Sequence, residues 1–443
     1  MAQLLDSAGY DALDDPDRAQ VLIVNTCGFI GPAKQESILA LRELAERKRP
    51  GQYLIAAGCL TQRYGAEVAQ QVPGLDGLLG TRRWMDIVDL VTRVKNRANG
   101  HPEPLYHLPE AATVGTDEQG TLRTAVQGAS AYVKIADGCR RPCAFCAIPL
   151  IKGTAVSRRA DAIVAEAQAL QEVGVKELIL IAQDTTDYGH DLGIKNGLAG
   201  LLKRLATETN LPWIRIMYAY PGAVTDEQIE VMAQHANILP YLDMPLQHGD
   251  REVLLKMRRP ANVEWVYDTI GKMRSAMPNL ALRSTFIVGY PGEEERHFAN
   301  LMQFVRDLRF DRLGVFTFSF EPGTTSEPLG DPVPQSVKEQ RKAELMALQQ
   351  QISLEKNQAL VGQTLDVLID GQGLVEDAEG NESPISVGRT YRDAPEIDGL
   401  VFIEETLPTG QIVPVRITGA MTYDLVASTQ LMPTYMLDTL PAA

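Results

Sequence analysis

The sequence predicts a multidomain α/β protein: an N-terminal doubly wound α/β domain, a central partial (β/α)6 barrel and a small C-terminal antiparallel β-barrel. Short apolar runs alternate with amphipathic stretches along most of the chain, which is the pattern of parallel sheets covered by helices. The last part changes to short alternating stretches separated by Gly, Pro and Asp, which is typical of a small barrel. The length of 443 residues suits several domains of ~100–200 residues each.

Composition and charge describe an ordinary globular protein. Hydrophobic residues make up 45% of the chain and charged residues 22%, which allows a sizeable core. No apolar run approaches the ~20 residues of a membrane-spanning helix, and the N-terminus lacks the basic start and apolar centre of a signal peptide. We therefore expect a cytoplasmic protein. The net charge of −15 argues against a nucleic-acid binder that works mainly through phosphate neutralisation.

The N-terminal domain is expected over residues 1–96. Its buried strands are predicted at 21–25, 53–57 and 76–80, and its helices at 33–47, 62–72 and 84–95. The chain opens with a helix-like piece, residues 1–9, where such a domain normally begins with a strand. The first strand is therefore expected to be absent from this sequence, with the natural start upstream of Met1.

A polar, Gly- and Pro-rich stretch at 97–128 predicts a linker or an extended hairpin-like connection. The partial barrel is expected over 129–356, where about six strand and helix patterns alternate, fewer than the eight of a full barrel. Its strands are predicted at 131–136, 177–182, 213–218, 241–246, 282–289 and 313–318, and its helices at 160–173, 197–208, 225–236, 262–276 and 294–308. Ser336 and Glu339 predict a capping box for a last helix over about 336–360.

The small antiparallel barrel is expected over 357–428, and a tail follows at 429–443. Between residues 357 and 425, twelve acidic residues face three arginines, so this module carries a charge of −9. Such a surface would repel RNA and attract a basic protein. Solubilisation alone is the alternative explanation.

Three cysteines follow directly on the first strand of the central region: Cys139, Cys143 and Cys146, in a tight loop with the spacing CxxxCxxC. Three thiolates so spaced can hold three corners of a cubane cluster and leave the fourth iron without a protein ligand. An open metal position is typical of a catalytic site. A zinc site would need a fourth ligand, and no histidine lies nearby in the sequence. Incidental buried cysteines are the alternative.

With this loop at a strand end, the chain resembles the radical S-adenosylmethionine (SAM) superfamily. The resemblance implies that SAM chelates the open iron of a 4Fe–4S cluster through its amino and carboxylate groups. One electron from the cluster then cleaves the sulfonium, and the resulting 5′-deoxyadenosyl radical abstracts a hydrogen atom. The resemblance also implies that Phe145, the aromatic residue before the last cysteine, packs near the adenine.

Cys27 and Cys59 form a second pair, each just after a predicted parallel strand, so we expect both at one edge of a sheet. Two small residues filling a core are the alternative. The segments 25–30 (NTCGFI) and 58–60 (GCL) resemble the methylthiotransferases, radical SAM enzymes with an auxiliary 4Fe–4S cluster and a C-terminal TRAM barrel. The resemblance runs over about 1–425.

One family segment is missing from this sequence: the Gly-Cys-x-Lys-Asn run that supplies the third cysteine of the auxiliary cluster in that family. Either the start is misplaced or the auxiliary cluster has only two protein thiolates. We favour a misplaced start, because a sheet without its first strand would leave a buried edge unpaired.

Further cofactor contacts are implied by the same resemblance. Gln183 and Asp184 end the second barrel strand and are expected near the methionine moiety of SAM. The turn at Gly289 could bring backbone near the adenosine, although as local structure it needs no ligand.

Three residues are candidates for catalysis. His248 follows a strand and could make a proton or substrate contact, with a structural role as the alternative. Lys152 stands where the family usually has an arginine and lacks the bidentate fork of that side chain. Arg158 is therefore the other candidate to clamp a carboxylate.

The methylthiotransferases divide by substrate between an adenosine of transfer RNA and one aspartate of ribosomal protein uS12. The acidic barrel and the string at 392–399 (RDAPEIDG) favour the uS12 branch, and segments 25–30 and 320–324 fit it more weakly. The resemblance implies hydrogen abstraction from the β-carbon of the aspartate, followed by coupling to sulfur that is held at the auxiliary cluster and methylated by a second SAM. An electron donor and a sulfur source are then needed as partners.

Two alternatives remain at this stage. The first is the transfer-RNA enzyme, which would bind RNA with an affinity that falls steeply with salt. The second is a non-catalytic iron–sulfur or ribosome-assembly protein that uses the acidic barrel as a docking module. Cleavage of SAM would exclude that second reading.

Overall fold

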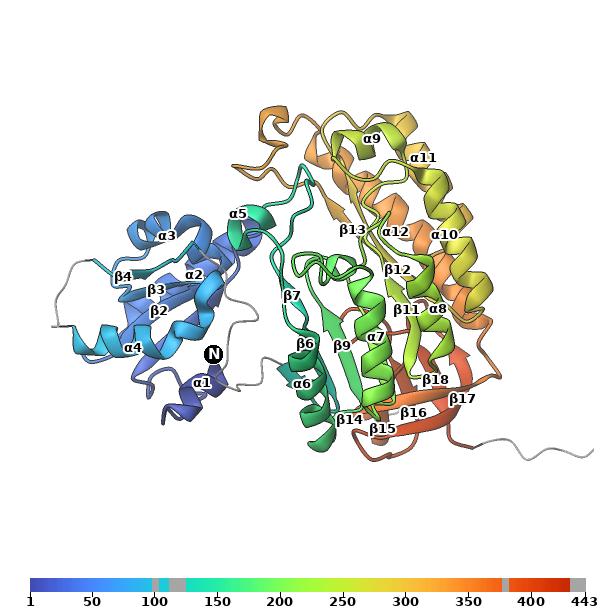
Figure 1. Ribbon diagram of the computed structural model, residues 1–443, viewed down its shortest axis with the longest axis horizontal. Helices are drawn as coiled ribbons and strands as arrows, with labels where there is room; N and C mark the ends of the chain where they lie inside the picture. Colours follow the sequence, from blue (N-terminus) through green and yellow to red (C-terminus); the bar gives the residue numbers. More distant parts are fainter. Residues whose placement is uncertain (98–102, 111–124, 377–381, 431–443) are drawn as a thin grey trace, which may run out of the picture.

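The computed structural model describes residues 1–97, 103–110, 125–376 and 382–430, coloured from blue to red along the chain in Figure 1. An N-terminal α/β unit, a larger central α/β sheet and a closed C-terminal barrel follow one another in the sequence. The predicted fold class is confirmed in all three parts. No helix among the described residues is both long and apolar enough to cross a membrane.

The N-terminal unit is a parallel sheet in the order β1-β2-β3-β4. Its strands are β1 (Val21–Thr26), β2 (Tyr53–Gly58), β3 (Gly77–Gly80) and β4 (Leu105–His107), and its helices are α1 (Ala2–Ser7), α2 (Gly31–Arg47), α3 (Cys59–Gln71) and α4 (Ile87–Asn96). Apolar side chains cover both faces of this sheet in two separate clusters. Within the described residues no strand pairs with the outer edge of β1.

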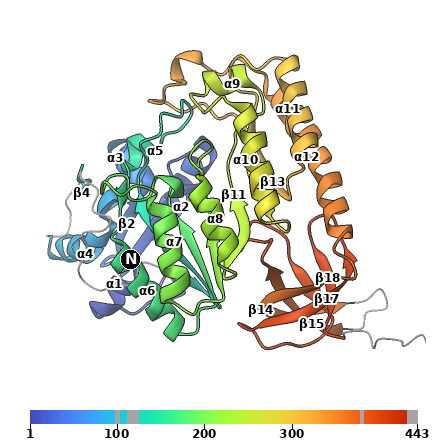
Figure 2. The same ribbon diagram turned by 45° about the vertical axis from the view of Figure 1, so that its right-hand side comes forward.

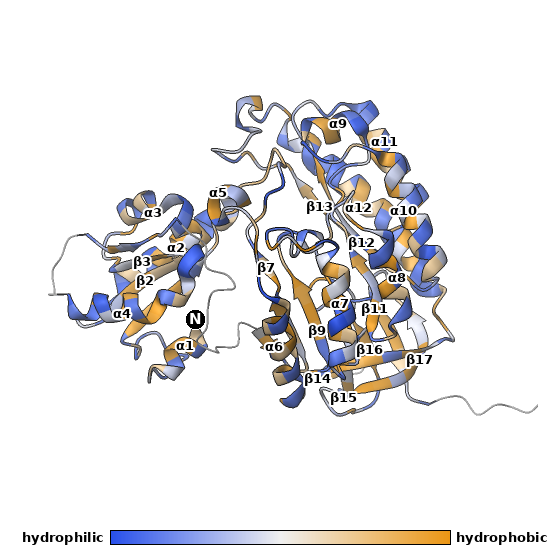
Figure 3. Ribbon diagram, viewed as in Figure 1, coloured by the Kyte–Doolittle hydropathy of each residue, from blue (hydrophilic) through white to orange (hydrophobic). Residues whose placement is uncertain are grey.

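The central sheet has the order β13-β12-β11-β10-β9-β6-β5. Six strands are parallel, namely β6 (Ser130–Lys134), β9 (Glu177–Ile181), β10 (Trp213–Ile216), β11 (Ile238–Asp243), β12 (Ala281–Val288) and β13 (Arg312–Thr317), while β5 (Ala125–Gln127) is antiparallel. Figure 3 shows the apolar strands covered by helices of mixed hydropathy. These helices are α6 (Ala160–Glu172), α7 (Gly197–Glu208), α8 (Asp226–Gln234), α10 (Val263–Ala276), α11 (Glu295–Leu308) and α12 (Gln335–Gln358).

The C-terminal barrel closes in the order β14-β15-β16-β18-β17. Its strands are β14 (Thr364–Glu376), β15 (Glu382–Thr390), β16 (Val401–Ile403), β17 (Ile412–Ala420) and β18 (Leu425–Ser428). It lies at the start of the central strands, below them in Figure 2. Buried ion pairs join the two parts there: Arg389 with Glu177 at 2.8 Å, and Arg312 with Asp393 at 2.5 Å.

The N-terminal unit contacts the opposite end of the central sheet. Arg63 pairs with Glu321, which follows β13, at 2.8 Å, and both side chains are buried. Arg82 donates to the carbonyl oxygens of Leu150 and Ile151 in α5 (Ile148–Lys152), at 3.1 and 2.9 Å. The N-terminal unit is therefore fixed against the segment that follows the three-cysteine loop.

The connection expected at 97–128 contributes β4 to the first sheet and β5 to the second. Residues 98–102 and 111–124 lie outside the described residues, as does the tail from residue 431 on. The capping box predicted at Ser336 does not form. Helix α12 begins one residue earlier, after Pro334, whose fixed φ suits a helix start without a side-chain cap.

Candidate active site

The three-cysteine loop leaves the central sheet through a short extension, β7 (Ala136–Asp137). Gly138 follows with φ of +80°, and a Cβ there would lie 2.2 Å from the carbonyl oxygen of Thr154, so only glycine fits. The next residue, Cys139, donates its N–H to the carbonyl of Gly153 at 3.1 Å. These contacts fix where the loop begins.

Cys139, Cys143 and Cys146 all line one cavity of about 480 Å³. The other walls come from the carboxyl ends of β9, β10 and β11 and from the loops that follow them. In a sheet of parallel strands this end is where ligands bind. The three cysteines predicted to act together are thus gathered around one space.

The chemistry of these thiols suits a cluster better than a single ion. Burial raises the pKa of Cys139 to about 11 and that of Cys146 to about 12, so both are neutral thiols near pH 7 and must lose protons to bind metal. In the described part of the chain, no three His, Cys, Asp or Glu side chains converge tightly enough to hold one metal ion. Three thiols that line one cavity are the protein ligands that a cubane cluster with one open iron requires.

Phe145, which was expected beside the adenine, lines the same cavity, and so does Gln183 after β9. The Oε1 atom of Gln183 is buried and accepts no hydrogen bond within the described residues. Because a buried acceptor without a donor is costly, this amide is available to a bound molecule. Asp184 does not line the cavity. Its carboxylate accepts from Nε of Arg141 at 2.6 Å and from the N–H of Thr186 at 3.0 Å.

Two residues of the cavity wall have backbone in the left-handed region. Tyr218 has φ of +61° after β10, and Gln247 has φ of +74° after β11. Such conformations are costly for residues other than glycine and cluster at functional sites. The backbone after β10 and β11 thus adopts conformations that Tyr218 and Gln247 do not favour, and it does so at the cavity wall.

His248 lies next to the cavity wall but is fully buried behind it. Its Nδ1 accepts the N–H of Asp250 at 2.9 Å, and its Nε2 lies 3.7 Å from a carboxylate oxygen of Glu293. Burial lowers the pKa of His248 to about 3, so the imidazole is neutral at physiological pH. Only one ring nitrogen is engaged, because Nε2 is buried and makes no hydrogen bond within the described residues.

Gly289 follows β12 with φ of +73° and does not line the cavity. Its N–H donates to Glu293 at 2.8 Å, and a Cβ would meet the side chain of Lys338 at 2.3 Å. The turn therefore needs glycine for its own conformation and for the packing of α12.

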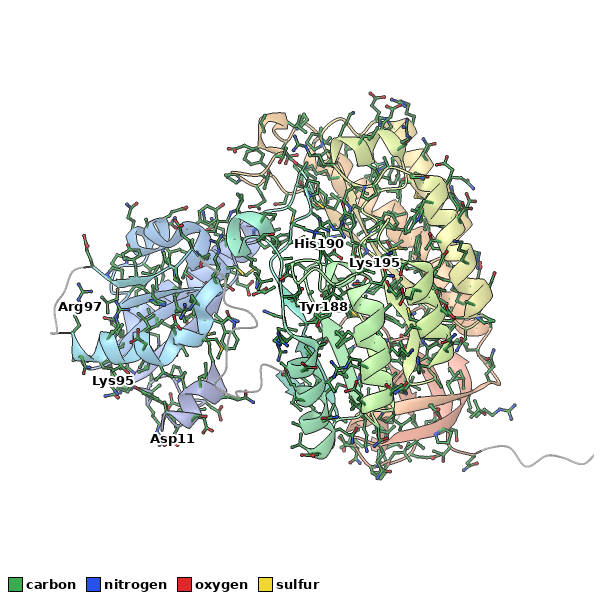
Figure 4. All side chains as sticks on the ribbon, in the orientation of Figure 1. Asp11, Lys95, Arg97, Tyr188, His190 and Lys195 are labelled. Carbon is green, nitrogen blue, oxygen red and sulfur yellow. The ribbon has the colours of Figure 1, made fainter. Side chains whose placement is uncertain are left out.

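Lys152 and Arg158 both use their charge inside the protein. The Nζ of Lys152 lies 2.6 Å from Asp137, and Arg158 pairs with Glu166 of α6 at 2.5 Å. The carbonyl oxygen of Arg158 also accepts the hydroxyl of Tyr188, which Figure 4 shows in the loop after β9. Neither basic side chain lines the cavity.

Cys27 and Cys59 lie together at the edge of the N-terminal sheet. Thr26 and Gly58, the residues just before them, are paired in the register of β1 and β2. Cys27 is exposed and Cys59 half-buried. Burial raises the pKa of Cys59, while the nearby Lys152 and a hydrogen bond with Thr81 oppose that shift. The second cysteine site thus adjoins the segment that follows the three-cysteine loop.

Several wall residues were not singled out from the sequence: Phe29, Arg141, Tyr220 and Arg259. Phe29 belongs to the N-terminal unit, only two residues after Cys27, so this unit closes part of the cavity. Arg141 lies inside the three-cysteine motif and could have been noticed there. Nothing in the sequence pattern points to Arg259, because a loop between two helices brings it in.

Comparisons with known proteins agree with this architecture. The family model described as the radical SAM superfamily matches residues 133–305, the TRAM domain matches 361–429, and the uncharacterized protein family UPF0004 matches 1–80. Among solved structures, the radical S-adenosylmethionine methyltransferase TsrM of Kitasatospora setae superposes with a TM-score of 0.52 at 13% identity, covering 82% of this chain and 68% of that one. At this identity the likeness shows the fold alone.

Two curated relatives are both called ribosomal protein uS12 methylthiotransferase RimO. The protein of Roseiflexus sp. (strain RS-1) is 44% identical over 96% of this chain and 92% of its own length. The protein of Chloroflexus aurantiacus is 46% identical over 96% of this chain and 94% of its own length. With the three domains in the same order, this chain belongs to the RimO family of radical SAM methylthiotransferases.

Proposed function

We propose that this protein transfers a methylthio group to the β-carbon of an aspartate of ribosomal protein uS12. The observation that carries the proposal is the cavity at the strand ends, where three cysteines and an unpartnered amide face one space. The uS12 specificity rests on the relatives, which act on that protein by name.

We propose that Cys139, Cys143 and Cys146 hold a 4Fe–4S cluster and that SAM occupies the rest of the cavity. Such a pair supplies a 5′-deoxyadenosyl radical when bound and reduced. The fit is supported by three thiols around one cavity and by the free acceptor of Gln183, which suits the amino group of an amino acid. Phe145 offers an aromatic face for a base.

The chain's own residues bind, orient and exclude water. Tyr218, Tyr220 and Phe145 give the cavity an apolar wall, which keeps water from a reactive radical. Phe29 of the N-terminal unit adds to that wall, so closure depends on how the two units dock. We expect no direct contact with the substrate from the three residues that were candidates for catalysis. Lys152 and Arg158 are engaged in ion pairs, and His248 is buried behind the cavity wall.

Cys27 and Cys59 are proposed to hold the auxiliary cluster that carries the transferred sulfur. The support is their adjacency at the ends of β1 and β2 and their place beside Lys152. Within this sequence the pair supplies two of the three thiolates expected in the family. An electron donor and a sulfur source complete the reaction, and we propose that this protein is cytoplasmic.

The C-terminal barrel is proposed to attract the basic substrate protein. Part of its charge is used internally, because Asp393 and Asp398 are buried against arginines of the central sheet. Exposed acidic side chains remain, among them Asp366, Glu382 and Glu404. These carboxylates lie at the start of the central strands, and the cavity lies at their ends. They would therefore attract uS12 to the protein, while the cavity would orient the target aspartate.

The test is mass spectrometry of uS12 after incubation with anaerobically reconstituted protein, SAM and a reductant. One aspartate should gain about 46 Da, the difference between H and SCH3. A matched incubation with transfer RNA should give no modified adenosine. Modified RNA and unmodified uS12 would reverse the substrate assignment, and no cleavage of SAM at all would leave only a non-catalytic role.

A further inference from the structure

Two arginines stack on one aromatic ring of the cavity, and they differ in one respect. The guanidinium carbons of Arg141 and Arg259 each lie 4.2 Å from the ring centroid of Tyr220. Arg141 has carboxylate partners, Asp184 at 2.6 Å and Asp187 at 3.6 Å. No aspartate or glutamate of the described chain forms an ion pair with Arg259.

Arg259 is nevertheless buried, with only 8% of its surface exposed. Its Nη1 lies 3.4 Å from Sγ of Cys143, and its Nη2 donates to the carbonyl of Pro245. The third nitrogen of the guanidinium, Nε, is buried and has no hydrogen-bond partner among the described residues. A buried guanidinium without an anion is strongly disfavoured, so this position is built for an anion that enters the cavity.

A cluster-bound thiolate at Cys143 would not complete the site, because it engages Nη1 and leaves Nε free. A planar guanidinium fork matches a carboxylate best. We propose that Arg259 binds a carboxylate in the cavity and is thereby a substrate- or cofactor-binding residue of this enzyme. This inference rests on the proposed function, which brings two carboxylates to the cavity: the side chain of the target aspartate and the amino-acid end of SAM.

The test uses anaerobically reconstituted full-length protein with Arg259→Gln, which removes the charge, and Arg259→Lys, which keeps it without the fork. Arg258→Gln is the matched control, because Arg258 is the exposed neighbour. For each protein, the dissociation constants of SAM and of two uS12 loop peptides are measured, one with the target aspartate and one with asparagine in its place. Iron content and melting temperature check loading and folding, and the lysine variant serves if the glutamine variant does not load.

If the carboxylate is that of the target aspartate, the wild-type protein prefers the aspartate peptide by about tenfold or more, as expected for a charge-assisted hydrogen bond. Arg259→Gln abolishes that preference and leaves SAM binding unchanged. If the carboxylate is that of SAM, the same variant weakens SAM binding by about tenfold and keeps the peptide preference. Either result supports the inference, with a smaller loss in Arg259→Lys and none in Arg258→Gln.

Unchanged binding of both SAM and the two peptides in Arg259→Gln would overturn the inference and leave Arg259 as a partner of Cys143 alone. That outcome is distinct from failure of the proposed function. In the latter case the wild-type protein itself would place no methylthio group on uS12, whatever the binding constants.

Discussion

Both ends of the central sheet hold buried ion pairs, but at the cavity end one buried arginine has no carboxylate partner among the described residues. Where the strands start, arginines meet carboxylates across the junction with the C-terminal barrel: Arg389 reaches Glu177 at 2.8 Å, and Arg392 reaches Asp311 at 3.0 Å. Where the strands end, Arg259 has no carboxylate partner among the described residues, and Oε1 of Gln183 has no donor. The ion pairs at the strand starts join two parts of the molecule, whereas Arg259 and Gln183 at the strand ends line a cavity that a ligand can enter.

Not all acidic residues of the C-terminal barrel contribute charge to its surface. The charge of −9 counted from the sequence treats all acidic residues alike. In the structure, Asp393 and Asp398 are buried against Arg312 and Arg283 and present no charge to solvent. The net charge of the barrel therefore overstates the negative charge that a partner protein meets at its surface. The exposed carboxylates determine how strongly the barrel attracts a basic partner.

The largest effect is expected at the cavity end. Cys143→Ala should reduce SAM cleavage by the reduced, reconstituted protein to background, because loss of one of the three thiolates of this loop destabilises the cluster and removes the arrangement in which a single iron stays open for SAM. Cys27→Ala is the matched control and should keep the cleavage while it abolishes methylthio transfer. Deoxyadenosine is measured by chromatography. Equal cleavage in the Cys143 variant and the wild type would refute the assignment of the site.

The ion pairs at the strand starts should contribute to stability. Glu177→Gln removes the one carboxylate that contacts both Arg215 and Arg389, at 2.7 and 2.8 Å, and leaves two buried guanidinium groups undercompensated. The free energy of unfolding should fall by about 3–5 kcal/mol. Glu208→Gln breaks the exposed pair with Arg204 and should have little effect. Denaturant titration compares the two variants, and equal losses would show that burial of the ion pair does not matter.

The buried histidine near the cavity predicts a pH dependence. The folded protein holds the pKa of His248 at about 3, against 6.5 for an ordinary histidine, so only the unfolded chain takes up this proton as the pH falls below 6.5. The free energy of unfolding should therefore decrease when the pH is lowered from 8. At pH 5 the contribution of His248 to this decrease is roughly 2 kcal/mol.

His248→Asn tests this contribution, because the amide oxygen can still accept the N–H of Asp250. The variant should show a flatter curve of melting temperature against pH between 8 and 5. Glu293 is present in both proteins, so the difference between their curves reports on the histidine. Parallel curves would mean that the pKa of the imidazole is the same in the folded and the unfolded protein.

The smallest effect is expected on the surface of the C-terminal barrel. A double substitution, Glu382→Gln with Glu404→Gln, should slow association with uS12 a few-fold at low salt and leave it unchanged at high salt. Glu43→Gln, an exposed change in the N-terminal unit, should have no such effect. Stopped-flow association rates measure the difference. A salt-independent loss would indicate a specific contact instead of general attraction.

The sequence predicted most of the fold because buried strands and amphipathic helices follow local periodicity. The exceptions have local causes. The strand predicted at 241–246 lies at Ile238–Asp243 and so includes Pro240. A proline disrupts most strands, but here it lies where the pairing with β10 is irregular, so the strand tolerates it. A capping box forms at the start of α11, between Glu294 and His297, where the residue types do not follow the usual pattern.

The site was predicted only where chemistry is concentrated in a short segment. Cys139, Cys143 and Cys146 could be grouped by spacing, and Gln183 by its place at a strand end. Arg259 and Phe29 could not, because they reach the cavity from distant parts of the chain through docking and loop geometry. The turn at Gly289 could be predicted from the sequence. Its close packing against Lys338 could not, because the two residues are far apart in the chain.

The hydrogen bonds from Arg82 to the carbonyl oxygens of Leu150 and Ile151 have a consequence for the proposed sulfur transfer. Helix α5, which Arg82 contacts, starts two residues after Cys146. The N-terminal unit with Cys27 and Cys59 is therefore attached to the chain only a few residues from the three-cysteine loop. A substitution at Arg82, far from either set of thiols in sequence, should misalign donor and acceptor and uncouple radical formation from product.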